Sequence, residues 1–230
     1  WVFAGTETIE IRSPNRVRYA RGIDFKEYNS STQAGILNEL MYVDFEYVIT
    51  HSFSCMSKRD GKDFLERQQK QLKNSDDGSV TQVQDISAAI EMLADGQFVM
   101  GQYHFSLLVF DDSVDAVAKR TSEAVTIIQD MGFLASIITT ATEAAFYAQL
   151  PANWFYRPRI AGITSRNFCG LCSFHNFASG KRDNNPWGEA ITMMQTPAGQ
   201  PYYVNFHATK VDEDSFDKKT LANTRIIGQS

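Results

Sequence analysis

The sequence predicts an α+β protein in which a ferredoxin-like antiparallel sheet with helices is followed by the first strands of a second domain. Some segments alternate apolar and polar residues with a period of two, which is typical of half-buried strands. Others repeat apolar residues every three or four positions, which is typical of amphipathic helices. These segments follow the order strand–helix–strand, a helical pair and again strand–helix–strand, and this order predicts the fold.

The first strand–helix–strand unit begins with a period-two segment, Arg21–Tyr28, which predicts a strand. Residues 30–32, two serines and a threonine, are favourable helix caps. The apolar spacing after them predicts a short helix through about Tyr42. Alternation then resumes and predicts a second strand over Tyr47–Met56.

The helical pair comes next. Ser57 is a capping residue with Asp60 three positions later, and the apolar spacing that follows predicts a helix through about Leu72. Asn74–Ser79 is a polar turn. A second amphipathic segment follows this turn and ends at Gly96.

The second strand–helix–strand unit starts with a Phe-, Leu-, Tyr- and Val-rich strand over Val99–Phe110. A helix is predicted to begin at Ser113 and to stop at Gly132. A further strand over Phe133–Thr140 and a short helix over Glu143–Leu150 complete the unit. We therefore expect residues 1–150 to form one amino-terminal domain.

The composition changes after residue 150. Pro151–Gly188 is rich in proline, glycine, asparagine, arginine and aromatic residues, so we interpret 151–188 as a segment that crosses between domains. Glu189–Thr196 and Tyr202–Ala208 read as a hairpin turned by residues 197–200. We assign 189–230 to a second domain.

The net charge, the composition and the motifs of the sequence argue against several classes of protein. Net charge is −5 over 230 residues, which gives no general case for nucleic-acid binding. No stretch approaches the ~18 apolar residues that a membrane helix needs. Three cysteines are too few for a disulfide scaffold and are typical of a reducing compartment. The sequence has no nucleophile elbow, zinc-protease motif or dinucleotide loop, so we predict no catalytic residue.

Two alternatives use other residues. Cys169, Cys172 and His175 follow a C-x-x-C-x-x-H pattern, which fits three zinc ligands, a redox pair, or side chains with a purely structural role. A ferredoxin-like domain can also bind RNA through exposed stacking aromatics, although the net charge argues against this function. His51 and His104 lie in predicted strands, where we interpret them as hydrogen-bonded core or edge residues.

A basic loop in the crossing segment is a candidate contact site. Lys181 and Arg182 lie close to Asn185 and Trp187. This group suits contact with a partner, a nucleotide or another domain, and the alternative is an exposed turn.

At the other end of the second domain, Thr224–Ile227 reads as a buried strand that leads into Gly228, Gln229 and Ser230. A phosphate-binding P-loop begins in this way.

Several segments together resemble the CagE/TrbE/VirB family, the large ATPases that power bacterial type IV secretion and conjugation. The segments are Arg166-Asn167-Phe168, Phe174–Phe177, Gly180-Lys181, Asn185–Gly188, Gly199–His207 and Thr224–Ser230, with Thr50–Phe53 and Leu150–Asn153 upstream. The resemblance spans roughly Arg21 to Ser230. Cys169 stands where a small residue such as alanine is expected, which favours a structural role for the cysteine pair.

This resemblance implies the amino-terminal scaffold and docking region of such an ATPase, cut where a RecA-like motor begins. It implies that ATP and Mg²⁺ are cofactors of the full-length protein, that Gly228, Gln229 and Ser230 open its P-loop, and that this part alone is inactive. The implied partners are other type IV secretion subunits, including a small inner-membrane subunit, and further copies of the ATPase. The implied location is peripheral, at the cytoplasmic face of the bacterial inner membrane. The transported substrate and any contact with nucleic acid stay open.

Overall fold

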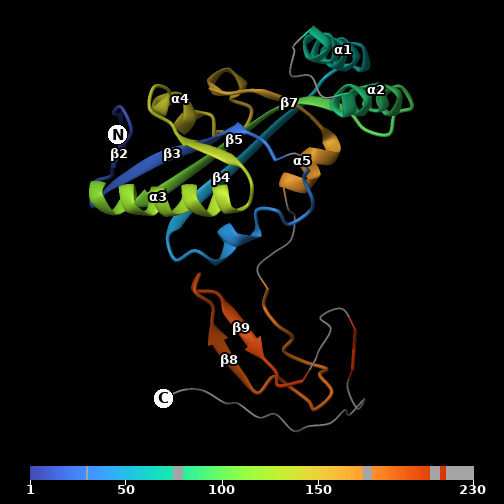
Figure 1. Ribbon diagram of the computed structural model, residues 1–230. Coiled ribbons are helices and arrows are strands. Elements are labelled where there is room, and N and C mark those ends of the chain that lie inside the picture. The colour runs from blue at the N-terminus through green and yellow to red at the C-terminus, as the bar shows by residue number, and fades with distance from the viewer. Residues whose placement is uncertain (30, 75–79, 173–177, 208–212, 216–230) are drawn as a thin grey trace. The chain divides into compact units, whose positions relative to one another are not determined.

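The computed structural model describes residues 1–29, 31–74, 80–172, 178–207 and 213–215 (Figure 1). The chain divides into two compact units. The first consists of Trp1–Leu40 and Phe45–Ser173, and the second consists of Met41–Asp44 and Phe174–Ser230. Each unit is described by itself.

The first unit is built on an antiparallel sheet. Its strands are β1 (Val2–Ala4), β2 (Ile9–Arg12), β3 (Val17–Glu27), β4 (Glu46–Cys55), β5 (Met100–Asp111), β6 (Leu134–Ile137) and β7 (Ala161–Thr164). Ile23 of β3 pairs with Leu107 of β5 and with Ile137 of β6, so β3 lies between those two strands. β4 pairs with the other side of β5. The central order β6-β3-β5-β4 interleaves the two predicted units, which confirms the ferredoxin-like sheet and the α+β class.

Helices join and cover these strands. They are α1 (Lys58–Asn74), α2 (Val80–Ala94), α3 (Val114–Asp130), α4 (Thr142–Tyr147) and α5 (Ser165–Leu171), with short 3-10 helices η1 (Asn38–Tyr42) and η2 (Trp154–Tyr156). α1 and α2 form the predicted helical pair between β4 and β5, and Figure 1 shows them side by side at one end of the sheet. Ser113 caps α3 by accepting a hydrogen bond from the backbone N–H of Ala116, at 3.1 Å.

Both faces of the sheet are covered, which explains why β5 is buried along most of its length. On one face, Ala124 and Ile128 of α3 share a cluster with an aromatic stack in which the rings of Phe25 and Phe105 lie 3.8 Å apart. On the other face, Leu108 of β5 packs with Phe146 of α4. A separate small cluster, which includes Leu65 and Leu93, joins α1 to α2.

The helix predicted from residue 30 to Tyr42 is largely wrong. Turns occupy 34–37, and only Asn38–Tyr42 is helical, as the 3-10 helix η1. Gly35 has a φ of 84°, a left-handed conformation that interrupts a right-handed helix. The apolar positions are buried as expected, since Leu37 and Leu40 belong to the same core cluster as residues of α3. Turns, rather than a helix, bring them there.

The structure adds elements that the sequence analysis did not predict. β1 and β2 form a hairpin before β3, and β3 itself begins at Val17 rather than at residue 21. β7 and α5 lie in the range that we interpreted as a crossing segment, yet β7 pairs with β5 in the first sheet. The first compact unit therefore extends past residue 150.

In the second unit, β8 (Thr192–Gln195) and β9 (Pro201–Val204) form the predicted hairpin. Its turn is closed by a hydrogen bond from Thr196 N–H to the Gln200 carbonyl, at 2.9 Å. Gly199 has the left-handed φ of 78° that the turn requires. The predicted strand Thr224–Ile227 lies outside the described residues, so the RecA-like assignment stays a prediction.

Candidate docking surface

A row of aromatic side chains is exposed on the first unit. Trp154, Phe155 and Tyr156 of η2 are 45%, 92% and 39% exposed. Leu150 and Ile160, on either side of η2, are also about half exposed. Single exposed apolar residues are ordinary, but a contiguous group usually marks a contact surface. We call residues 154–156 the aromatic turn.

Local backbone chemistry holds the aromatic turn in place. α4 ends before Pro151, and Ala152 adopts a φ of 63°, which is uncommon for a residue with a side chain. The Asn153 amide donates a hydrogen bond to the Tyr147 carbonyl at the end of α4, at 2.9 Å. The chain is thereby reversed sharply, and the three aromatic residues follow on a single 3-10 turn.

Two arginines then fasten the chain to the sheet. Arg159 Nε donates to Asp24 Oδ2 of β3 at 2.9 Å, and the Asp24 side chain is only 7% exposed. His104 Nδ1 of β5 lies 2.8 Å from the Arg159 carbonyl, so the neutral imidazole donates there. Burial lowers the pKa of His104, which outweighs the hydrogen bond to Arg159 and the charge of Asp24.

Arg157 is held by neutral groups. Its guanidinium donates to Ser54 Oγ of β4 at 3.3 Å and to the backbone and side-chain oxygens of Gln102 of β5 at 3.4 Å. It also lies 4.8 Å from the centre of the Trp154 ring, in a cation–π contact. Arg157 thus links the aromatic turn to the face of the sheet.

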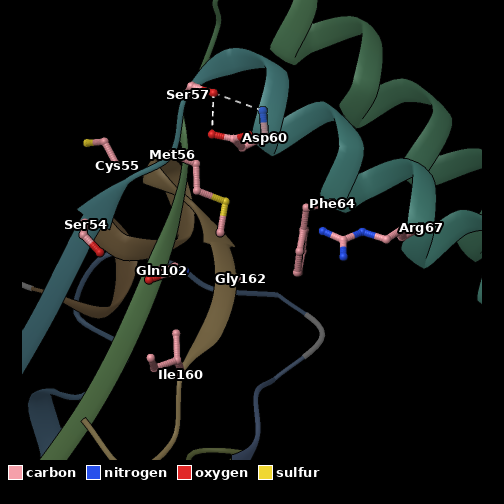
Figure 2. A pocket seen from close by; sticks show the side chains of 10 residues that line it. All are labelled: Ser54, Cys55, Met56, Ser57, Asp60, Phe64, Arg67, Gln102, Ile160 and Gly162. Carbon is pink, nitrogen blue, oxygen red and sulfur yellow. Dashed lines mark hydrogen bonds between the residues drawn. The ribbon is translucent and has the colours of Figure 1, made fainter. Parts of the chain in front are cut away.

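Ser54 and Gln102, to which Arg157 bonds, line a hollow of about 550 Å³ (Figure 2). Its floor contains Ser54, Gln102 and Gly162, which are cross-strand neighbours on β4, β5 and β7. α1 supplies a wall with Asp60, Phe64 and Arg67, and Ile160 lies at the side of the aromatic turn. The volume is in the range of small-ligand or peptide side-chain sites.

The wall and the floor fit closely because Gly162 has no side chain. A Cβ at residue 162 would lie 2.3 Å from the Phe64 ring, so only glycine permits this contact. At the top of the wall, the Ser57 hydroxyl donates to Asp60 Oδ2 at 2.6 Å and accepts from Asp60 N–H at 3.1 Å. This confirms the predicted cap of α1.

The predicted contact residues lie together in the second unit. Asn185 is 3% exposed, and its amide donates to the Lys181 and Arg182 carbonyls at 3.2 Å. The Lys181 ammonium donates to the Glu213 carbonyl at 2.6 Å, and its side chain is 10% exposed. Both residues therefore hold the loop in shape. Arg182 and Trp187 are exposed.

Some of the other predicted site residues lie outside the described residues. They are His175, Gly228, Gln229 and Ser230. Cys169 lies near the end of α5 and Cys172 is its C-cap residue, and both are free thiols. Burial raises the pKa of Cys172, and a helix C-terminus also disfavours a thiolate. Among the described residues, no group of three His, Cys, Asp or Glu side chains is placed to hold a metal ion.

The sequence analysis missed the aromatic turn and the hollow. One signal was available, because residues 144–182 contain five basic residues and no acidic one, around a Trp-Phe-Tyr run.

Within the described part of the chain, no helix has the length and apolar character needed to cross a membrane.

Comparison with known proteins gives consistent matches. A model of the "CagE, TrbE, VirB family, component of type IV transporter system" matches residues 1–159. The chain is 64% identical, over its full length, to the type IV secretion system protein virB4 of Brucella suis. It is 54% identical over 229 residues to the PtlC homolog of Bordetella bronchiseptica. It is 39% identical, over 90% of its length, to virB4 of Bartonella henselae. The chain spans 28%, 28% and 26% of the lengths of these relatives.

Proposed function

The chain belongs to the CagE, TrbE, VirB family, and from this premise we propose that it is the scaffold and docking region of a type IV secretion ATPase. Its task is to hold the ATP-driven motor against the channel complex at the inner membrane. The observation that carries this proposal is the aromatic turn. Phe155 is 92% exposed between two further exposed aromatic residues.

The anchoring of the aromatic turn supports a docking role. Trp, Tyr and Arg are the residues that most often dominate binding energy at protein interfaces. Here Trp154 and Tyr156 are followed by Arg157, and the turn is fixed to β3, β4 and β5 through Arg157 and Arg159. A surface held on rigid strands loses little conformational freedom when a partner binds.

The motor itself is assigned to the rest of the longer protein. The relatives are more than three times as long as this chain, since it spans 28% of their length. We assign ATP and Mg²⁺ binding to that protein, with Gly228, Gln229 and Ser230 at the start of its P-loop. The partners are other secretion subunits, including a small inner-membrane subunit, and further copies of the ATPase. The location is peripheral, at the cytoplasmic face of the inner membrane.

The test replaces Phe155 by serine in the full-length protein of a secreting cell. Phe155→Ser removes an exposed side chain, so the fold should be unaffected while co-purification with the other secretion subunits falls roughly tenfold, the effect of losing about 1.4 kcal/mol. Val80→Ser is the matched control, because Val80 is 72% exposed on α2, away from the aromatic turn. Normal assembly and secretion with Phe155→Ser would refute the docking role of this surface.

A further inference from the structure

We propose that the hollow beside the aromatic turn binds a carboxylate side chain of a partner segment. The inference rests on the proposed docking function, and it adds the chemical class of the partner. The segment carries an acidic residue for the hollow and an apolar residue that lies against Trp154, Phe155 and Ile160.

The first argument is the charge of the hollow. Among the described residues, the partners of Arg157 are all neutral, and they are Ser54, Gln102 and Trp154. In the same part of the chain, Arg67 has one bond, from Nε to the Asp63 carbonyl at 3.3 Å. Within the described ranges, neither guanidinium has a carboxylate within 4.0 Å. A carboxylate that entered the hollow would therefore meet the Arg67 guanidinium, with Arg157 bonded to Ser54 and Gln102 of the floor, without displacing an ion pair of either arginine.

The second argument is the position of these cations. Figure 2 shows Phe64 and Arg67 projecting from α1 beside the strands, where both line the hollow. Arg157 does not itself line the hollow, but it bonds to two residues that do, Ser54 and Gln102 of the floor. Burial lowers the pKa of Arg157, so its charge is incompletely hydrated and gains more from an anion than a fully solvated arginine would.

The acid that lines the hollow does not compete. Asp60 already accepts the Ser57 hydroxyl at 2.6 Å and lies in the first turn of α1, where a negative charge is favourable. Its charge is therefore stabilised by the cap and the amino-terminal end of α1 rather than by Arg67. The remaining polar groups of the floor, the Ser54 hydroxyl and the Gln102 amide, can donate to an anion or bind a bridging water.

The third argument is the apolar border. Ile160 is 48% exposed and lines the hollow at its junction with the aromatic turn. A guanidinium pair alone would also attract a phosphate group. The adjacent Trp154 and Phe155 rings instead favour a peptide in which an acidic residue alternates with apolar ones, because such a peptide covers both surfaces.

The test uses two short peptides with blocked ends. One alternates leucine with glutamate, and the other replaces each glutamate by glutamine. The readout is the NMR signal of the arginine Nε–H groups in the chain. We expect the glutamate peptide to shift the Arg67 and Arg157 signals in a saturable way, whereas the glutamine peptide should shift neither. Arg67→Gln should weaken binding several-fold, and Arg67→Gln with Arg157→Gln by more than about tenfold.

Arg166→Gln is the matched control. Arg166 lies outside the hollow and bonds to a neutral group, Gln97 Oε1, at 3.3 Å, so its loss should leave binding unchanged. Arg67 is exposed, so Arg67→Gln should stay folded even if Arg157→Gln does not. Equal binding of the two peptides, or an unchanged affinity in Arg67→Gln, would overturn the proposal. Inorganic phosphate that shifts both signals more strongly than the glutamate peptide would also overturn it, because the site would then select phosphate.

These outcomes are separable from the test of docking. If Phe155→Ser leaves assembly intact while the glutamate peptide still binds, the docking function fails and the carboxylate site stands. If Phe155→Ser disrupts assembly while the peptide does not bind, the docking function stands and the carboxylate site fails.

Discussion

At the scale of single residues, two strand histidines show how burial sets protonation. His51 Nδ1 lies 2.8 Å from the Tyr103 hydroxyl, and His104 bonds to the Arg159 carbonyl. Both are hydrogen-bonded members of the sheet, which confirms the interpretation of their positions in predicted strands. Burial lowers the pKa of His51 to about 4, and it lowers the pKa of His104 as well. Both imidazoles are therefore neutral in the folded chain at neutral pH.

The lowered pKa values of His51 and His104 predict that the folded chain loses stability in mild acid. An unfolded histidine has a pKa of about 6.5, so between that value and the lower folded value the unfolded chain binds more protons. The free energy of unfolding should be level above about pH 6.5 and should fall as the pH drops toward about 4, the pKa of folded His51. Urea unfolding at pH 7 and pH 5 measures the difference.

His51→Gln provides the control for this prediction. Glutamine can still bond to the Tyr103 hydroxyl but does not titrate in this range. The change in unfolding free energy between pH 7 and pH 5 should therefore be smaller in His51→Gln than in the parent chain. An equal change in both chains would assign the acid sensitivity to other groups.

At the scale of elements, the segment after η2 is joined to the sheet by an ion pair in addition to its hydrogen bonds. Arg159 reaches across to Asp24 of β3, whose side chain is 7% exposed, while the arginine side chain is 52% exposed. β7 begins two residues later and pairs with β5. The ion pair thus helps to hold the segment that leads into β7, together with the bonds of Arg157 and His104.

Arg159→Leu should destabilise the chain because it leaves the Asp24 carboxylate buried without its partner. Solvent screens the half-exposed arginine, so we expect a loss of about 1 to 2 kcal/mol rather than the larger cost of a fully buried pair. Asp24→Asn combined with Arg159→Leu should cost less than the sum of the single changes. Urea denaturation of all four chains gives the coupling, and additive losses would show that the pair contributes nothing.

At the scale of the whole molecule, the hydrophobic core that the described residues form belongs to the first unit. All three core clusters are made of residues between Ile9 and Leu171. In the second unit, all four residues of β8 are exposed, and Met193 and Met194 are each about 60% exposed. A two-stranded hairpin with an exposed strand contributes little stability by itself.

Residues 1–173 should therefore fold without the rest of the chain. We expect a cooperative thermal transition within about 3 °C of the transition of the 230-residue chain, since none of the described core residues is removed. Circular dichroism of both chains checks this. A shorter chain that does not melt cooperatively would show that the second unit is needed to complete the core.

The amino-acid sequence by itself determined the identity of most elements of the first unit and the family. Alternating or helical spacing records which side of an element is buried, so β4, β5, α1, α2 and α3 were predicted to within a few residues. The same spacing failed over residues 30–42, because turns with a left-handed Gly35 can also bury Leu37 and Leu40.

Only the tertiary structure decided where the candidate site lies. β7 is too short to show a period, and its place in the sheet comes from pairing with β5, about 60 residues earlier in the chain. The aromatic turn depends on Arg159 meeting Asp24, and the hollow depends on Phe64 lying over Gly162. These contacts join residues that are remote in sequence, and local spacing carries no information about such pairs.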